Sequence, residues 1–258
     1  PLESGVGGIV YDLTVFDDGT GPALYAGGLF STAGGASAKF IAKWDGTTWT
    51  PLGLGLNNWV RALGVFDDGT GAALYVGGYF TTAGGTEAKG IAKWNGTNWA
   101  ALDQGIQGTG VQAIAVFDGG HGAALYAGGY FDNVGAANMS ASDIARWDGA
   151  TWSALGAEWD APVAVETMAV FDDGTGRALH VGSPTNAKWN GSAWVSLGVE
   201  LPGRAFVVFD DGSGPALYGG STSIARWDGS NLTQLPWDAS SFVRALAVFD
   251  DGGGLALF

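Results

Sequence analysis

Pairs of aspartates beside glycine recur along the chain, and their carboxylates are the most numerous groups that could do chemistry. The motif FDDGTG occupies residues 16–21, 66–71 and 171–176, and variants of it follow Phe117, Phe209 and Phe249. Calcium takes six to eight oxygen ligands, and one such loop supplies only part of that set. Asp and Gly at these places also suit a short hairpin loop, so we interpret the motif as a turn with solvated carboxylates and predict no metal site.

Catalytic constellations are missing from the sequence. The chain has no Cys and only two His, which lie far apart at His121 and His180. No Ser/His/Asp arrangement and no phosphate-binding glycine loop leading into a helix is present. A carboxylate pair acting on sugars is possible in principle, but no spacing selects one. We therefore expect no catalytic residues and no cofactor.

One position varies within an otherwise constant frame, and it is the strongest functional signal. The frame repeats Val, Phe, Asp-Gly and Ala-Leu-Tyr, as in VRALGVFDDGTGAALYVGG at residues 60–78. The residue five places before the Phe changes from copy to copy: Tyr11, Arg61, Gln112, Glu166, Arg204 and Arg244. Three arginines among six places could bind a carboxylate or sulfate group through paired donors. The competing interpretation is that these side chains only brace neighbouring repeats.

The spacing of the copies predicts the elements that position these residues. The repeats are anchored at Phe16, Phe66, Phe117, Phe171, Phe209 and Phe249, with steps of 50, 51, 54, 38 and 40 residues. Periods of this size are typical of β-propeller blades. Within residues 60–103 the segments VRALGVF, AALYVGGYF, GIAKWNG and NWAAL predict four strands, here named A to D, joined by Gly-rich hairpins.

We therefore predict an all-β protein, a β-propeller of four-stranded antiparallel blades forming a single domain over residues 1–258. Five blades should be complete. The sixth should be partial, or composite: residues 1–6 align with the end of a strand D, and the chain stops within a strand B. A closed ring sharing one blade between the termini and a fragment of a longer array are both consistent with this.

The blade sequence resembles the kelch repeat of kelch and galactose-oxidase-type propellers. ALYVGG is followed by an aromatic-Asp or aromatic-Asn turn and a Trp, as at Trp94, Asn95 and Trp99. The Gly pair recurs at residues 27–28, 77–78, 128–129 and 219–220, whereas the fourth copy has Gly182-Ser183. The resemblance implies that Arg61, Arg204 and Arg244, at the start of the inner strand, contact ligands. The copper chemistry of galactose oxidase is not carried over, because it depends on a Cys that this chain lacks.

The predicted blades distribute charge and loops unequally. A–B and C–D turns should emerge on one face, which would gather fourteen of the 25 acidic residues there. The variable position should line the channel mouth on the opposite face, beside the B–C and D–A loops. B–C loops are long in the first three copies and short in the next two. The repeating Trp residues should pack between blades. Trp59, Trp159 and Trp237 fall in D–A connections, where they are candidate ligand anchors or cover the edge of the core.

Composition limits the partners. A net charge of −14 argues against nucleic-acid binding, and no apolar run is long enough to insert into a membrane. We expect a non-enzymatic binding or scaffold module of an extracellular or cell-surface assembly, exported by a bacterium, with a protein or glycan ligand on the face formed by B–C and D–A loops. The alternatives are a carbohydrate-binding propeller and a polysaccharide-active enzyme.

Overall fold

The repeats fold as antiparallel sheets, and the chain is an all-β protein with the β-propeller fold. The computed structural model describes residues 5–156, 164–236, 242–250 and 252–257, and these contain β-strands and no helix. Each of the first five repeats forms one blade, in which the four main strands pair in chain order. The predicted fold class is confirmed.

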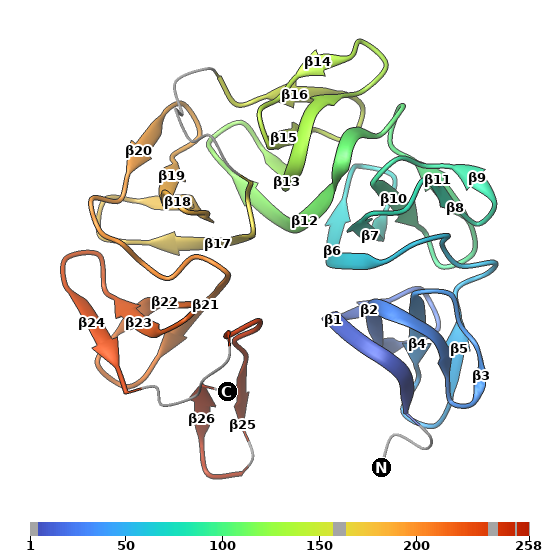
Figure 1. Cartoon of the computed structure of the whole chain (residues 1–258), viewed down its shortest axis with the longest axis horizontal. Helices are drawn as coiled ribbons and strands as arrows, with labels where there is room; N and C mark the ends of the chain where they lie inside the picture. The colour runs from blue at the N-terminus through green and yellow to red at the C-terminus, as the bar shows by residue number, and fades with distance from the viewer. Residues whose placement is uncertain (1–4, 157–163, 237–241, 251, 258) are drawn as a thin grey trace. The chain divides into compact units, whose positions relative to one another are not determined.

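The chain divides into two compact units, each of which is described by itself. Unit 1 comprises residues 1–116 and 124–155, and unit 2 comprises residues 117–123 and 156–258. Unit 1 carries blades 1 to 3 and unit 2 carries blades 4 and 5 together with the sixth repeat (Figure 1).

The blades of unit 1 are built from twelve main strands (Figure 1). Blade 1 consists of β1 (Val6–Asp17), β2 (Pro22–Ala33), β4 (Ile41–Trp44) and β5 (Trp49–Pro51). Blade 2 consists of β6 (Val60–Asp67), β7 (Ala72–Gly78), β10 (Ile91–Trp94) and β11 (Trp99–Ala101). Blade 3 consists of β12 (Ile106–Asp118), β13 (Ala123–Val134), β15 (Ile144–Trp147) and β16 (Trp152–Ala154). Their long B–C loops add the short strands β3 (Ala36–Ser37), β8 (Thr82–Ala83), β9 (Thr86–Glu87) and β14 (Met139–Ser140).

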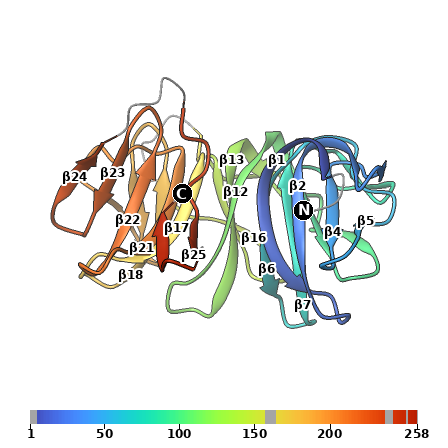
Figure 2. The same cartoon turned by 90° about the horizontal axis from the view of Figure 1, so that it is seen from below.

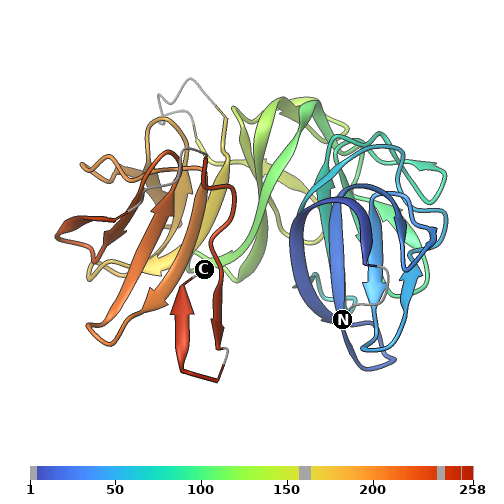
Figure 3. The ribbon, with the colours of Figure 1, turned by 60° about the horizontal axis from the view of Figure 1, so that its bottom comes forward.

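Unit 2 has shorter strands A and B and short B–C connections. Blade 4 consists of β17 (Thr167–Asp172), β18 (Arg177–Gly182), β19 (Ala187–Trp189) and β20 (Trp194–Ser196). Blade 5 consists of β21 (Ala205–Asp210), β22 (Pro215–Gly220), β23 (Ile224–Trp227) and β24 (Leu232–Leu235), which run side by side in Figure 2. The sixth repeat forms a hairpin of β25 (Val248–Asp250) and β26 (Leu255–Leu257), a separate two-stranded ribbon in Figure 3.

A composite sixth blade is not confirmed. The described part of the sixth repeat contributes two strands only. At the N-terminal end, Gly34 N donates a hydrogen bond to Gly5 O, and in blade 2 Gly84 N donates in the same way to Gly55 O. Gly5 is therefore equivalent to Gly55 of the D–A connection, as the sequence alignment predicts. Val6 already belongs to β1, opposite Ala33, and residues 1–4, which would carry the strand D, lie outside the described residues.

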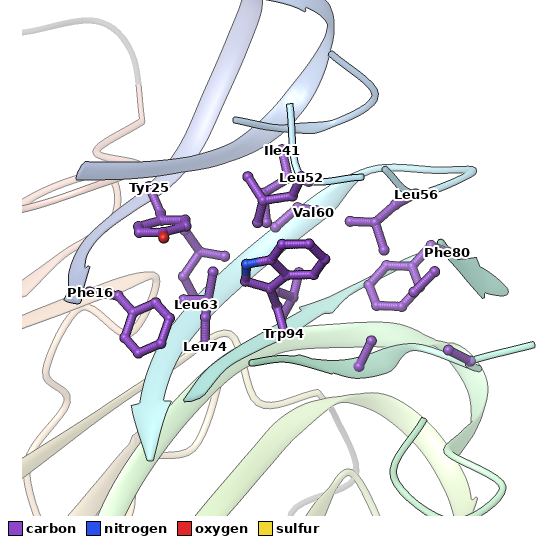
Figure 4. Packing of buried hydrophobic residues seen from close by; sticks show 14 of the residues in the cluster. Phe16, Tyr25, Ile41, Leu52, Leu56, Val60, Leu63, Leu74, Phe80 and Trp94 are labelled. Atoms are coloured by element: carbon purple, nitrogen blue, oxygen red, sulfur yellow. The ribbon is translucent and has the colours of Figure 1, made fainter. Parts of the chain in front are cut away.

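The hydrophobic core lies between neighbouring blades. Phe16, Tyr25 and Ile41 of blade 1 are buried against Leu63, Leu74 and Trp94 of blade 2 (Figure 4). A second cluster repeats this arrangement between blades 2 and 3, with Trp147 in the place of Trp94. The strand-C Trp therefore packs against the preceding blade, as expected for a residue that the repeat holds constant.

The inner strand of blade 1, which has no preceding blade in its unit, exposes apolar side chains that are covered in blade 2. Leu63 and Val65 of β6 contribute to the cluster between blades 1 and 2. The equivalent residues of β1, Leu13 and Val15, are 53% and 63% exposed. The inner strand thus carries an apolar stripe that only a neighbouring blade covers.

The A–B turns are held by two carboxylates with different roles. The first Asp of each pair is exposed and caps the turn: Asp67 Oδ1 accepts hydrogen bonds from Gly69 N at 2.8 Å and Gly71 N at 3.0 Å. In blades 1, 2 and 4 the second Asp is buried, contrary to the sequence-based expectation, whereas Asp211 of blade 5 is exposed. The Asp68 side chain is only 8% exposed and lies 2.6 Å from Lys93 Nζ. Blade 1 has the same pair between Asp18 and Lys43.

Each oxygen of the second Asp has defined partners. Asp68 Oδ1 accepts hydrogen bonds from the Thr70 amide and hydroxyl, and Oδ2 accepts them from Tyr75 and Lys93. Burial alone would raise the pKa of this carboxyl, but the hydrogen bonds from Lys93, Thr70 and Tyr75 outweigh it and hold the pKa well below its usual range. The carboxylate therefore stays charged and joins the A–B turn to strands B and C.

The C–D turn of one blade contacts the A–B turn of the preceding blade. A Cβ atom added at Gly96, in the C–D turn of blade 2, would lie 2.8 Å from the Asp18 carbonyl oxygen of blade 1. Gly149 approaches Asp68 in the same way, and in unit 2 Gly229 approaches Asp173. A–B and C–D turns thus meet on one face within each unit, as predicted, although Lys and Arg neutralise part of their charge.

Blade 4 contains an exception to the turn network. His180 replaces the Tyr of strand B; it is fully buried, and its Nε2, 4.0 Å from Asp173 Oδ2, has no hydrogen-bond partner among the described residues. Burial, opposed by the Ala178 carbonyl and the Asp173 carboxylate, lowers the pKa of His180 to about 4. The imidazole is therefore neutral at pH 7.

We predict that His180→Tyr stabilises the protein by about 1 kcal/mol at pH 7, because it restores the hydroxyl that donates to the turn carboxylate in blades 1 and 2. A buried neutral His gives stability that is fully present above the unfolded pKa and is lost as pH falls through 6.5 toward 4. At pH 4 this loss amounts to roughly 3 kcal/mol in the wild type relative to the variant. Urea unfolding at both pH values measures it.

The matched control is Tyr75→His, which should destabilise blade 2 and introduce a pH dependence of the same sign. Equal pH dependence in the wild type and in His180→Tyr would contradict the assignment of a buried neutral imidazole.

Candidate functional site

In blades 1 and 2 the variable position is the residue of a β-bulge in the inner strand. In blade 1 the register runs from Val10 opposite Gly28 directly to Asp12 opposite Gly27, which leaves Tyr11 without a partner. In blade 2 the register skips Arg61 in the same way, between Val60 and Ala62. A bulge redirects a side chain away from the regular alternation of the strand. This residue is thereby released from the packing that fixes its neighbours.

The glycine pair on strand B makes room for the bulge. A Cβ atom at Gly78 would lie 2.1 Å from Trp59 O, and one at Gly28 would lie 2.0 Å from Ile9 O. Gly129 makes the same close approach to Gly110 O, next to Gln112. In blades 1 to 3 the second glycine of the motif is therefore required, because the inner strand crosses it too closely for a side chain.

Three of the six predicted residues lie together in unit 1. The Arg61 guanidinium stacks 4.2 Å above the centre of the Tyr11 ring, and Arg61 Nε donates to Gln112 Oε1 at 2.8 Å. Gln112, only 8% exposed, in turn donates through Nε2 to the Tyr79 hydroxyl at 2.5 Å. Three successive blades thus contribute to one side-chain network, which we call the Arg61 cluster: Tyr11, Trp59, Arg61, Tyr79 and Gln112.

The Arg61 cluster has an aromatic rim. Trp59 is 39% exposed, and its ring lies 6.5 Å from that of Tyr11 and 6.0 Å from that of Tyr79. Tyr79, just after β7, was not predicted as a site residue. Its sequence signal was weak: an aromatic residue follows the glycine pair in copies 2 and 3, where copy 1 has Leu29.

Two arginines of the candidate site differ in how their charge is satisfied. Of the three guanidinium nitrogens of Arg61, only Nε is hydrogen-bonded to a described residue, and that residue, Gln112, is neutral. Within unit 2, Arg204 Nε lies 3.4 Å from Glu166 Oε2, and its guanidinium stacks 4.4 Å above the Phe242 ring. Arg204 is therefore paired with a carboxylate. Arg61 has no carboxylate partner among the described residues, and its Nη1 and Nη2 atoms are left to donate to a ligand.

The other predicted residues are less informative. Arg244 is exposed in unit 2. Trp159 and Trp237 lie outside the described residues. The six variable positions fall three in each unit, and the structure brings together Tyr11, Arg61 and Gln112 in one group and Glu166 and Arg204 in the other.

A partly buried carboxylate beside the Arg61 cluster was not predicted. Asp12 accepts hydrogen bonds from Leu13 N at 2.8 Å and from Leu63 N of the next blade at 2.7 Å. Burial raises the pKa of Asp12 to about 6, and the two backbone hydrogen bonds oppose this rise. In unit 2, Thr167 occupies the equivalent place and accepts from Phe206 N at 3.2 Å. This position links successive inner strands.

The turn carboxylates do not assemble a metal site in the described part of the chain. No group of three or more His, Asp or Glu side chains could hold an ion there. The second Asp of each motif is committed to Lys or Arg in blades 1, 2, 4 and 5.

None of the described residues forms a helix long and apolar enough to span a membrane.

The chain resembles known proteins in fold and not in sequence. No protein-family model and no curated protein matches it. Among solved structures, it is similar to the computationally designed Ika8 protein, with a TM-score of 0.56 and 17% identity over 99% of this chain and 72% of that one. It is also similar to an ancestral GH74 enzyme, with a TM-score of 0.63 and 17% identity over all of this chain and 35% of that chain. Both support the fold alone.

We predict that millimolar calcium leaves the thermal unfolding midpoint unchanged, because a ligand stabilises only the state that binds it and the buried turn carboxylates already have cationic partners. Differential scanning fluorimetry with calcium and with chelator measures this. A rise in the midpoint that the chelator reverses would show that the exposed first Asp residues recruit an ion.

Proposed function

We propose that the chain is a non-catalytic binding module of an extracellular or cell-surface assembly, and that it recognises an anionic group of its partner through the Arg61 cluster. The finer resemblance to kelch-like repeats supports this proposal, since it implies ligand contacts from the arginine at the start of the inner strand. The net charge of −14 repels an acidic partner at long range, so the attraction has to come from the local positive charge of Arg61.

The observation that carries the proposal is the state of Arg61. Its guanidinium is fixed in orientation by the Tyr11 ring and by Gln112, yet Nη1 and Nη2 have no acceptor among the described residues. A guanidinium held in this way offers two parallel donors that match a carboxylate or sulfate. Because the side chain is already ordered, binding loses little conformational entropy.

A glycan carrying the acidic group is the second candidate, and the aromatic rim favours it. Trp59 presents part of an indole beside Tyr11 and Tyr79, and such rings bury large apolar surfaces while keeping a polar handle. Apolar ring faces suit the CH faces of a sugar. Under either candidate, Arg61 supplies the charge recognition.

We predict that Arg61→Ala weakens binding of an acidic ligand about tenfold to a hundredfold, since hydrogen bonds to charged groups contribute about 1.5–3 kcal/mol. Arg61→Lys should recover only part of the affinity, because an ammonium lacks the planar pair of donors. Arrays of carboxylated and sulfated glycans and of acidic peptides identify the ligand, and titration of the strongest binder gives the affinities.

Arg204→Ala is the matched control, because that arginine is already paired with Glu166. It should keep the affinity within about threefold, on the ordinary scale of surface substitutions. Ligands without an acidic group, or equal losses in the two alanine variants, would contradict the proposed recognition. Release of reducing ends from a bound polysaccharide would contradict its non-catalytic character.

A further inference from the structure

A polar pocket in unit 1 lies apart from the residues of the Arg61 cluster. It measures about 260 Å³ and is lined by Glu87, Lys89, Asp103 and Gln104. The first two residues belong to the B–C loop of blade 2, and the other two follow β11 in the D–A connection. Ile106 N donates to Lys89 O at 2.8 Å, so backbone contacts hold these two segments together.

Asp103 adopts a backbone conformation that copies 1, 3 and 4 assign to glycine. Its φ is 53°, and the equivalent residues Gly53, Gly156 and Gly198 have φ values of 58°, 80° and 68°. A residue with a Cβ is disfavoured in this left-handed region. Repeat 2 therefore carries a carboxylate at a position where the backbone favours glycine, and a positive φ at a residue with a Cβ directs attention to the role of its side chain.

The pocket is also where two closely similar copies diverge. Residues 83–106 repeat residues 33–56 with the same lysine, Lys39 or Lys89, at the pocket position. The other three lining positions differ: Ser37, Gly53 and Leu54 in repeat 1 stand where repeat 2 has Glu87, Asp103 and Gln104. Every one of these differences adds hydrogen-bonding capacity.

Much of that capacity is unused within the protein. Asp103 Oδ2 accepts from Ala136 N at 2.7 Å, and Glu87 Oε1 lies 3.0 Å from Lys89 Nζ. Asp103 Oδ1 and the whole Gln104 amide have no hydrogen-bond partner among the described residues. Carboxylates accept hydrogen bonds from hydroxyl groups, and the Gln104 amide and the Lys89 ammonium can donate hydrogen bonds to hydroxyl oxygens.

We propose that this pocket binds a small hydroxyl-rich ligand, a single sugar unit. Vicinal hydroxyl groups both donate and accept, as the mixed lining requires, and the volume lies just below the range of about 300–1,000 Å³ found for larger ligands. No group of three or more His, Asp or Glu side chains in the described part of the chain could hold a metal ion, so we propose a ligand that is not a bare cation. The site goes beyond the proposed function and uses none of the residues of the Arg61 cluster.

The experiment uses the whole chain and five free monosaccharides: glucose, galactose, mannose, xylose and N-acetylglucosamine. Saturation-transfer difference NMR at millimolar concentrations should detect binding of at least one of them. Replacing Glu87→Ser, Asp103→Gly and Gln104→Leu together converts the pocket to the repeat 1 sequence, relieves the strained φ, and should weaken that binding at least tenfold.

Two further variants distinguish recognition from loop disturbance. Gln104→Leu removes no hydrogen bond within the protein and should alone weaken sugar binding at least threefold, whereas Leu54→Ala at the equivalent place in repeat 1 should leave it unchanged. Arg61→Ala should also leave it unchanged, which separates this site from the proposed anionic one. No transfer to any of the five sugars, or transfer that survives the triple replacement or Gln104→Leu, would overturn the proposal.

Discussion

The buried carboxylate under the A–B turn is the group on which the repeat frame depends. In blade 2, Asp68 collects hydrogen bonds from its own turn, from Tyr75 on strand B and from Lys93 on strand C. A charge taken out of water is tolerated only when its partners are complete, and blades 1 and 2 keep the Asp, the Lys and the Tyr hydroxyl together. The turn so fixed then contacts the C–D turn of the next blade, which makes the network part of the packing between blades.

The stabilising turn network and the proposed recognition site are located at opposite ends of strand A. The turn end carries the constant Phe and the first Asp of the motif, whose contacts restrict variation. The other end carries the bulge, where Tyr11 and Arg61 have no partner in the register and can change without disturbing the ladder. This separation explains why one position varies within an otherwise repeated sequence motif. Asp103 is a second example of variation outside the turn network: it lies in the D–A connection after blade 2 and has a positive φ where copies 1, 3 and 4 have glycine.

Much of the fold could be predicted from the sequence because repetition reveals it. The period, the Asp-Gly turns and the alternation of strand A were sufficient to give four strands per blade, and the constant Trp residues indicated packing between blades. The same repetition predicted that Arg61 and Gln112 occupy equivalent places, and the structure brings them into contact.

Other features depend on three-dimensional contacts that a pattern does not carry. Adjacent aspartates look alike in sequence, so nothing distinguished the solvated Asp67 from the ion-paired Asp68. The bulge follows from how strands A and B cross, and the contribution of Tyr79 follows from the bulge. Arg61 and Arg204 were equivalent in the repeat; only their neighbours, a neutral amide in one case and Glu166 in the other, distinguish a free charge from a paired one.

The most direct test of this account is a double-mutant cycle on Asp68 and Lys93, with both residues replaced by Ala singly and together and the unfolding free energies measured in urea. A buried, fully hydrogen-bonded pair that holds the frame predicts a coupling energy of at least about 1.5 kcal/mol. A coupling below about 0.5 kcal/mol, the value typical of exposed ion pairs, would contradict the central role given to the turn carboxylate.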